Sequence, residues 1–170
     1  DIAKYRDEEY NHMYKIDDFT NLSIDEKFDM YCILGNALVH IEEENDFGLF
    51  AKESYKVLNE NGKLLFDYMP EKEMSEYSGT DIFENEDYIV ERDIITTKES
   101  KYIYTMTFHF NIKNKQTGDT IKTGDSMISR CYDREFINKH LSDAGYESIN
   151  YLNPDSTSAE IKDGIVSAIK

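Results

Sequence analysis

A nearly continuous apolar run decides the fold of this chain: Phe28-Asp29-Met30-Tyr31-Cys32-Ile33-Leu34, followed directly by Gly35 and Asn36. Such a run is typical of a parallel strand that is covered on both faces of its sheet. We therefore expect the thiol of Cys32 to be buried. Because ligands bind beyond the carboxyl ends of parallel strands, Gly35 and Asn36 stand where a binding site would form.

The residues after this strand complete a strand–helix–strand unit. Apolar side chains recur at helical spacing over residues 45–59, and Asn45 and Asp46 are candidates for capping this helix. A second apolar strand follows at residues 63–68. A unit of this length predicts a crossover between two parallel strands.

The middle of the chain has a different periodicity. Residues 102–112 alternate between apolar and polar side chains, and strand-like runs lie on either side, at 88–96 and 120–132. This pattern predicts a three-stranded antiparallel meander with one apolar face. We expect an antiparallel sheet inserted into an α/β fold to cover a ligand pocket or to join subunits.

The last part of the chain returns to helix and strand. A helix is predicted after Asp133, a candidate N-cap, and Gly145 is suited to end it. Two further strands are expected, at 146–152 and 163–169. We therefore divide the chain into residues 1–81, the C-terminal part of an α/β core; 82–132, an antiparallel lid or oligomerisation insert; and 133–170, the helix and strand pair that complete the core sheet.

Charge and composition restrict the partners. The 170 residues carry 19 Lys and Arg against 35 Asp and Glu, a formal net charge of −16. Nucleic acids and anionic membrane surfaces need a basic patch, so neither is an expected partner. Cys32 and Cys131 are too few for a disulfide framework, which favours a reducing, cytoplasmic setting. The histidines and cysteines lack the spacing of metal ligands, and no two glycines are two positions apart, so no Gly-x-Gly loop exists in these residues.

Several motifs in order carry a family resemblance. Phe28–Ile41 and Val57–Asp67 resemble the fourth-strand motif and the passage into strand five of class I S-adenosylmethionine-dependent methyltransferases. Leu34–His40 is similar to the Leu-Gly-Asn-Ser-x-x-His of glycine and sarcosine N-methyltransferases, and the insert and Tyr132–Phe136 resemble deoxysugar amine N,N-dimethyltransferases. The resemblance implies an α/β fold, a three-layer sandwich with a mostly parallel, Rossmann-like sheet and an antiparallel β insert.

The resemblance also implies a cofactor, S-adenosylmethionine, and its contacts. Asp18, which follows a β-type run at 11–16, matches the acidic residue that accepts a hydrogen bond from the adenine amino group, and Phe19 would lie beside the ring. A turn residue that binds the following backbone amides is the alternative interpretation of Asp18. The implied cofactor-binding set is Asp18, Phe19, Leu34, Gly35, Asn36 and His40.

Three of the implied site residues are catalytic candidates. Asn36 and His40 match positions at the methionine end of the cofactor, and Tyr68 would face the acceptor pocket. In the alternative interpretation, Asn36 is a loop residue and His40 lies at the start of a helix, and the hydrogen bonds of both side chains are made with the local backbone. A sulfonium already carries an activated methyl group, so aligning the acceptor suffices and no metal is expected.

Two departures from the family limit the interpretation. Residues 68–71 contain no Arg where glycine-using relatives hold a carboxylate, so we expect a small-molecule amine other than glycine as acceptor. The family's first strand and glycine loop would precede Asp1, so we expect this chain to be a fragment. The alternative function is a non-catalytic, methyltransferase-like regulatory subunit that lacks its cofactor loop. In either case the antiparallel insert could join two copies into a homodimer.

Overall fold

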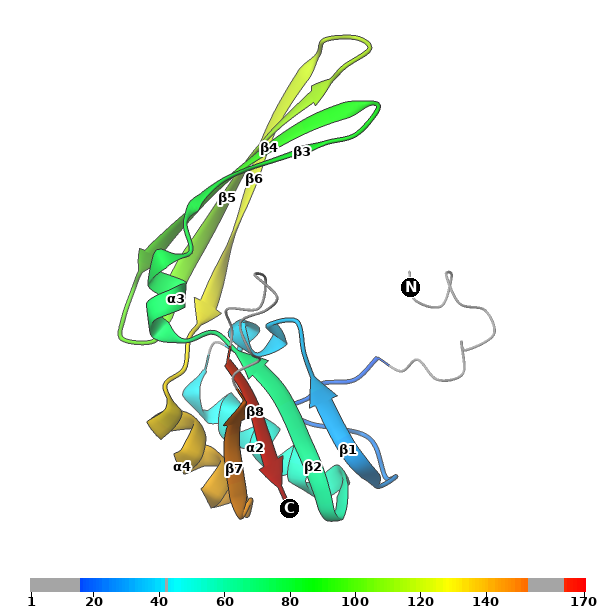
Figure 1. Cartoon of the computed structure of the whole chain (residues 1–170), viewed down its shortest axis with the longest axis vertical. Coiled ribbons are helices and arrows are strands. Elements are labelled where there is room, and N and C mark those ends of the chain that lie inside the picture. Colours follow the sequence, from blue (N-terminus) through cyan, green and yellow to red (C-terminus); the bar gives the residue numbers. More distant parts are fainter. Residues whose placement is uncertain (1–15, 42, 153–163) are drawn as a thin grey trace.

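The computed structural model describes residues 16–41, 43–152 and 164–170, which form two four-stranded sheets (Figure 1). Most of the strand expected at 11–16 lies outside these residues. The first sheet, called the core sheet here, has the order β1-β2-β8-β7, and the second, called the arm, has the order β3-β4-β5-β6. The core strands are β1 (Phe28–Ile33), β2 (Leu58–Tyr68), β7 (Ser148–Leu152) and β8 (Gly164–Ile169); the arm strands are β3 (Gly79–Glu84), β4 (Tyr88–Lys98), β5 (Ile103–Asn114) and β6 (Thr120–Arg130).

The predicted parallel pair is confirmed. β1 and β2 run parallel, with Ile33 opposite Phe66, so their carboxyl ends lie side by side. The other two pairs of the core sheet, β2–β8 and β7–β8, are antiparallel. The connection between β7 and β8, residues 153–163, is shorter than the dozen or more residues that a parallel crossover needs. Its length agrees with the antiparallel pairing of these two strands. Three core strands therefore share one direction and β8 opposes them, so the described pairing does not confirm a mostly parallel sheet.

Both long helices lie on one face of the core sheet, where α2 (Glu44–Val57) and α4 (Arg134–Ala144) pack against each other (Figure 1). Leu64, Phe66 and Val166 point to this face and are fully buried. Successive residues of a strand point to opposite faces, so their neighbours point away from the helices. The described residues thus form two layers, and the third layer of the expected sandwich is not among them.

The uncovered face corrects two expectations about β1. Its strand exists as predicted, but Met30 is 53% exposed and Cys32 is exposed rather than buried. β1 stands at the end of the strand order, with β2 as its neighbour, so one of its edges is not paired with a described strand. An apolar run of this kind indicates a strand suited to burial on both faces, and the described residues bury only one.

The two helices differ at their beginnings. α4 begins as predicted, with the carboxylate of Asp133 accepting a hydrogen bond from the N–H of Phe136 at 2.8 Å, and Gly145 follows it with φ 108°. α2 begins after Glu43, earlier than expected, and no side chain caps it. Asn45 and Asp46 therefore lie within its first turn instead of capping it.

The arm has one strand more than predicted and extends away from the core sheet (Figure 1). The additional strand is β3, which follows the short helix α3 (Glu71–Glu76) and is exposed along its whole length. The predicted apolar face is present: Ile94, Tyr104 and Met106 are buried in one cluster, which also contains Met74 of α3. No helix among the described residues is long and apolar enough to cross a membrane.

Candidate functional site

A tight turn follows β1 at the carboxyl end of the parallel pair. Gly35 and Asn36 both have left-handed backbone conformations, with φ of 83° and 58°. Their two N–H groups donate to the carboxylate of Asp67 in β2, at 2.8 Å from Gly35 and 3.0 Å from Asn36. Asp67 is the residue after Phe66, the partner of Ile33, so the parallel register places its side chain beside the turn.

The local sequence explains this turn. Glycine adopts the left-handed region without a steric cost, and asparagine is among the residues that tolerate it best. The turn leads into the short 3-10 helix η2 (Ala37–His40), which contacts β6. Tyr132 donates a hydrogen bond to the carbonyl of Leu38 at 2.8 Å, and Arg130 donates to that of Ile41 at 3.2 Å. His40, the last residue of η2, is exposed.

Asp18 is a turn residue in the structure. Its carboxylate accepts hydrogen bonds from the N–H and the hydroxyl of Thr20, at 2.8 and 2.7 Å, and these bonds lower its pKa. Phe19 packs edge-on against Phe50 of α2, with 6.1 Å between ring centroids. The turn interpretation of Asp18 is thus the one seen, and a contact of Asp18 and Phe19 with adenine stays a prediction.

Tyr68 lies in the main apolar core. It points to the helix-covered face, is only 5% exposed, and packs edge-on against Tyr151 at 6.2 Å between centroids. A Cβ at Gly164 would overlap its ring, so the absence of a side chain there makes room for it. The described contacts of Tyr68 are those of a core residue, and its role toward an acceptor is untested.

The structure therefore brings two of the predicted site residues together and adds Asp67 to the site. Gly35 and Asn36 meet at Asp67, whereas Tyr68, its chain neighbour, points to the other face of the sheet. The sequence places Asp67 within a family motif but does not identify it as a site residue. Its signal in the sequence is an acid at the end of a second parallel strand, and only the strand register shows which turn it meets.

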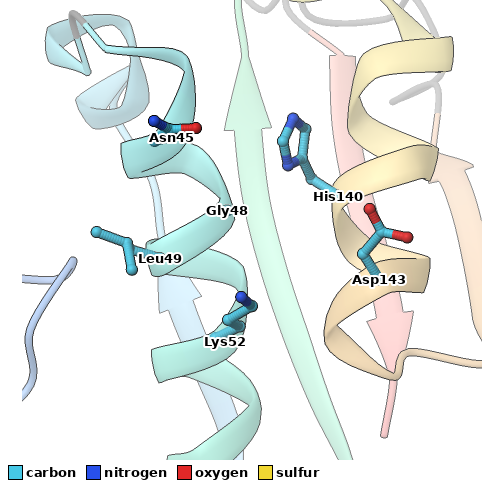
Figure 2. A pocket seen from close by; sticks show the side chains of 6 residues that line it. All are labelled: Asn45, Gly48, Leu49, Lys52, His140 and Asp143. Atoms are coloured by element: carbon cyan, nitrogen blue, oxygen red, sulfur yellow. The ribbon is translucent and has the colours of Figure 1, made fainter.

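A separate cavity lies between α2 and α4 (Figure 2). Its volume is about 360 Å³, and none of the predicted site residues lines it. His140 points toward α2 here, and its buried Nε2 has no hydrogen-bond partner among the described residues. Burial lowers the pKa of His140. The cavity is lined by Asn45, Gly48, Leu49, Lys52, His140 and Asp143.

The sequence comparisons find no match, either among family models or among curated proteins. Comparison of structures does find similar folds. A structure of CalS10 with bound S-adenosylmethionine, an amino pentose methyltransferase from Micromonospora echinaspora, is 18% identical with a TM-score of 0.75. DesVI from Streptomyces venezuelae is 14% identical with a TM-score of 0.74. The sugar N-methyltransferase KedS8 from Streptoalloteichus is 15% identical with a TM-score of 0.73.

These matches include most of this chain and a smaller share of the other proteins. They cover 89% of this chain and 62% of CalS10 and DesVI, and 90% of this chain and 60% of KedS8. The chain thus spans less than two thirds of the length of these proteins. At such low identity the likeness concerns the fold, and the fold of this chain is that of the corresponding part of an S-adenosylmethionine-dependent methyltransferase.

Proposed function

We propose that this chain forms part of an S-adenosylmethionine-dependent methyltransferase that acts on the amine nitrogen of a small molecule. The observation that carries the proposal is the turn of Gly35 and Asn36, fixed by Asp67 at the carboxyl end of two parallel strands. This is where ligands bind in sheets of this kind. The likeness in fold to methyltransferases supports the same conclusion.

The residues at this turn fit one side of a cofactor crevice. Leu34 is 55% exposed and offers an apolar surface, and the half-buried Asn36, whose Oδ1 is shielded from solvent, lies beside it. Asn36 and His40 would contact the methionine end of S-adenosylmethionine, and Asp18 and Phe19 its adenine. The cofactor supplies an activated methyl group, so this chain's contribution is to orient and to exclude water, and such positioning can lower a barrier by roughly 7–11 kcal/mol.

Net charge and the absence of an arginine in residues 68–71 support the proposed class of acceptor. The net charge of −16 favours a positively charged or neutral ligand over an anion. Residues 68–71, which follow β2 closely, contain no Arg to hold a carboxylate. CalS10 and KedS8 are described as methyltransferases of an amino pentose and of a sugar nitrogen. We therefore infer an amino sugar or a similar amine, in preference to glycine.

Calorimetric titration with S-adenosylhomocysteine tests the cofactor. We expect saturable heat from the full-length protein and weaker binding by its Asn36→Ala variant. Asn59→Ala is the matched control, since Asn59 bonds Asp29 at the opposite end of the β1–β2 pair. Absence of saturable heat from the full-length protein would contradict the proposal and favour the non-catalytic subunit. Methyl transfer to amino sugars but not to glycine would then establish the acceptor class.

We also propose that the arm joins two copies of the chain. Its apolar face is buried near the core sheet, but farther out Phe83 is 51% and Ile121 63% exposed. Apolar patches of this kind mark interfaces. Ile121→Asn should shift sedimentation toward the monomer. Ile95→Asn, at a similarly exposed isoleucine that the register places on the opposite face of the arm, should not. A monomeric unaltered chain would contradict this proposal.

A further inference from the structure

We propose that Asp67 is a positioning residue: its carboxylate fixes the Gly35–Asn36 turn and thereby the half-buried side chain of Asn36, which borders the proposed ligand site. This inference deepens the proposed function and rests on it. It concerns a residue that itself need not touch the ligand, because its oxygens are already engaged by the two backbone N–H groups.

The turn needs an external anchor. Two successive residues with positive φ are an unusual conformation, and the second of them is not a glycine. Both N–H groups of the turn donate to Asp67 of the neighbouring strand, and both carboxylate oxygens accept hydrogen bonds. Hydrogen bonds to a charged acceptor are stronger than neutral ones, so the anchor is well suited to hold a strained turn.

Asp67 is not required for the rest of the fold. β1 and β2 are already paired from Met30 opposite Lys63 to Ile33 opposite Phe66. The fully buried core lies on the helix-covered face, and the half-buried side chain of Asp67 lies on the other. Its removal should therefore release the turn without unfolding the sheet.

The anchor also restricts what the turn can bind. Because the N–H groups of Gly35 and Asn36 are bonded to Asp67, this turn does not offer them to the carboxylate or phosphate of a ligand. Recognition falls instead to side chains at the turn, the exposed Leu34 and the half-buried Asn36, whose Oδ1 is shielded from solvent. A carboxylate beside them disfavours an anionic group and is compatible with the cationic sulfonium of the proposed cofactor.

Hydrogen exchange tests the anchor without any ligand. In Asp67→Ala, the amides of Gly35 and Asn36 should exchange at least about tenfold faster, with the rest of the core sheet unchanged. Asp29→Ala is the matched control, because Asp29 joins the same two strands through Asn59 at 2.8 Å but lies far from the turn. Unchanged exchange at Gly35 and Asn36, or faster exchange throughout the sheet, would overturn the proposal.

Binding of S-adenosylhomocysteine tests whether the anchor acts through Asn36. We expect affinity to fall about tenfold in Asp67→Ala and about threefold in Asp67→Asn, which keeps one acceptor oxygen, with no change in Asp29→Ala. Asn36→Gly removes the side chain but tolerates the φ of 58°. If Asp67 acts through Asn36, the double variant should bind no more than about threefold more weakly than Asn36→Gly. Losses that multiply would show independent roles and contradict the proposal.

The two measurements separate this inference from the function on which it rests. A full-length protein that binds no S-adenosylhomocysteine contradicts the proposed function, and the amide exchange still decides whether Asp67 holds the turn. A full-length protein that binds, together with an unaffected Asp67→Ala variant, contradicts the positioning role and leaves the proposed function standing.

Discussion

The two faces of the core sheet come from the same strands and differ sharply in their surroundings. On one face, Leu64, Phe66 and Val166 are fully buried beneath α2 and α4. On the other, Met30 and Cys32 are exposed among the described residues, and the Asp67-anchored turn lies at the end of this face. Alternation along a strand means that a single position decides between the two environments. The covered face carries stability, and the turn with its exposed neighbours carries the candidate chemistry.

The largest expected effect compares two adjacent leucines on these faces. Leu64 is fully buried, whereas Leu65 points away from the helices and is partly exposed. Leu64→Ala should lower the free energy of unfolding by about 2–5 kcal/mol, because it leaves a cavity in the core. Leu65→Ala should cost less than about 1.5 kcal/mol. Urea denaturation measures both. Equal losses would show that a further layer covers the second face in solution.

The reactivity of the two cysteines also compares a buried position with an exposed one. Cys131 is fully buried, and burial raises the pKa of its thiol to about 11. Cys32 is exposed on the uncovered face. At pH 8, a disulfide-exchange reagent should label Cys32 roughly a hundredfold faster than Cys131, since the thiolate is the nucleophile. Cys32→Ser should remove the fast phase. Slow labelling of both thiols would contradict the exposure of β1.

The beginnings of the two covering helices offer a smaller test. Asp133 caps α4 with its side chain, whereas Glu43, at the same position of α2, makes no capping bond. Asp133→Ala should therefore destabilise the chain by about 1 kcal/mol, and Glu43→Ala by only a few tenths. Asp133→Asn keeps a capping oxygen and should retain most of the stability in thermal melts. Similar losses for Asp133→Ala and Glu43→Ala would contradict the difference in capping.

Much of the fold follows from periodicity, and the rest depends on neighbours that periodicity does not show. The spacing of apolar residues predicted the parallel β1–β2 pair with its crossover helix, and the cap at Asp133 and the end at Gly145 were correct. β3 was not predicted, because an exposed edge strand has no buried side chains to create a pattern. The predicted burial of Cys32 was wrong, because an apolar sequence shows that a strand is suited to burial but does not show whether other residues cover it.

The candidate site was predicted in part for the same reason. The position of Gly35 and Asn36 at a strand end was visible in the sequence, but their anchor depends on strand register, which brings Asp67 beside them. Tyr68 differs from Asp67 by one position and consequently points into the core. A family resemblance names positions, and the alternation of the strand decides which of them face a ligand.

The smallest expected effect concerns His140, within the covering layer. Its ring packs 4.4 Å from that of Phe136, measured between centroids, and its Nδ1 would lie 3.2 Å from a Cβ at Gly48. Burial is the main cause that lowers its pKa, and Lys139 adds to it, while Glu44 on α2 and Asp143 on α4 act in the opposite direction. Lys52 of α2 lines the same cavity (Figure 2).

The sign of the pH dependence follows from this lowered pKa. The folded chain binds the proton on His140 less readily than the unfolded chain does, so stability is present above the unfolded pKa of about 6.5 and declines as the pH falls through it. His140→Gln should show a smaller loss of melting temperature between pH 7.5 and 5.5 than the unaltered chain, whereas His109→Gln, at an exposed histidine of the arm, should show the same loss. The difference between His140→Gln and the unaltered chain separates the contribution of His140 from that of the carboxylates, which titrate at lower pH. An unaltered slope in His140→Gln would mean that its imidazole is as accessible to protons in the folded layer as in the unfolded chain.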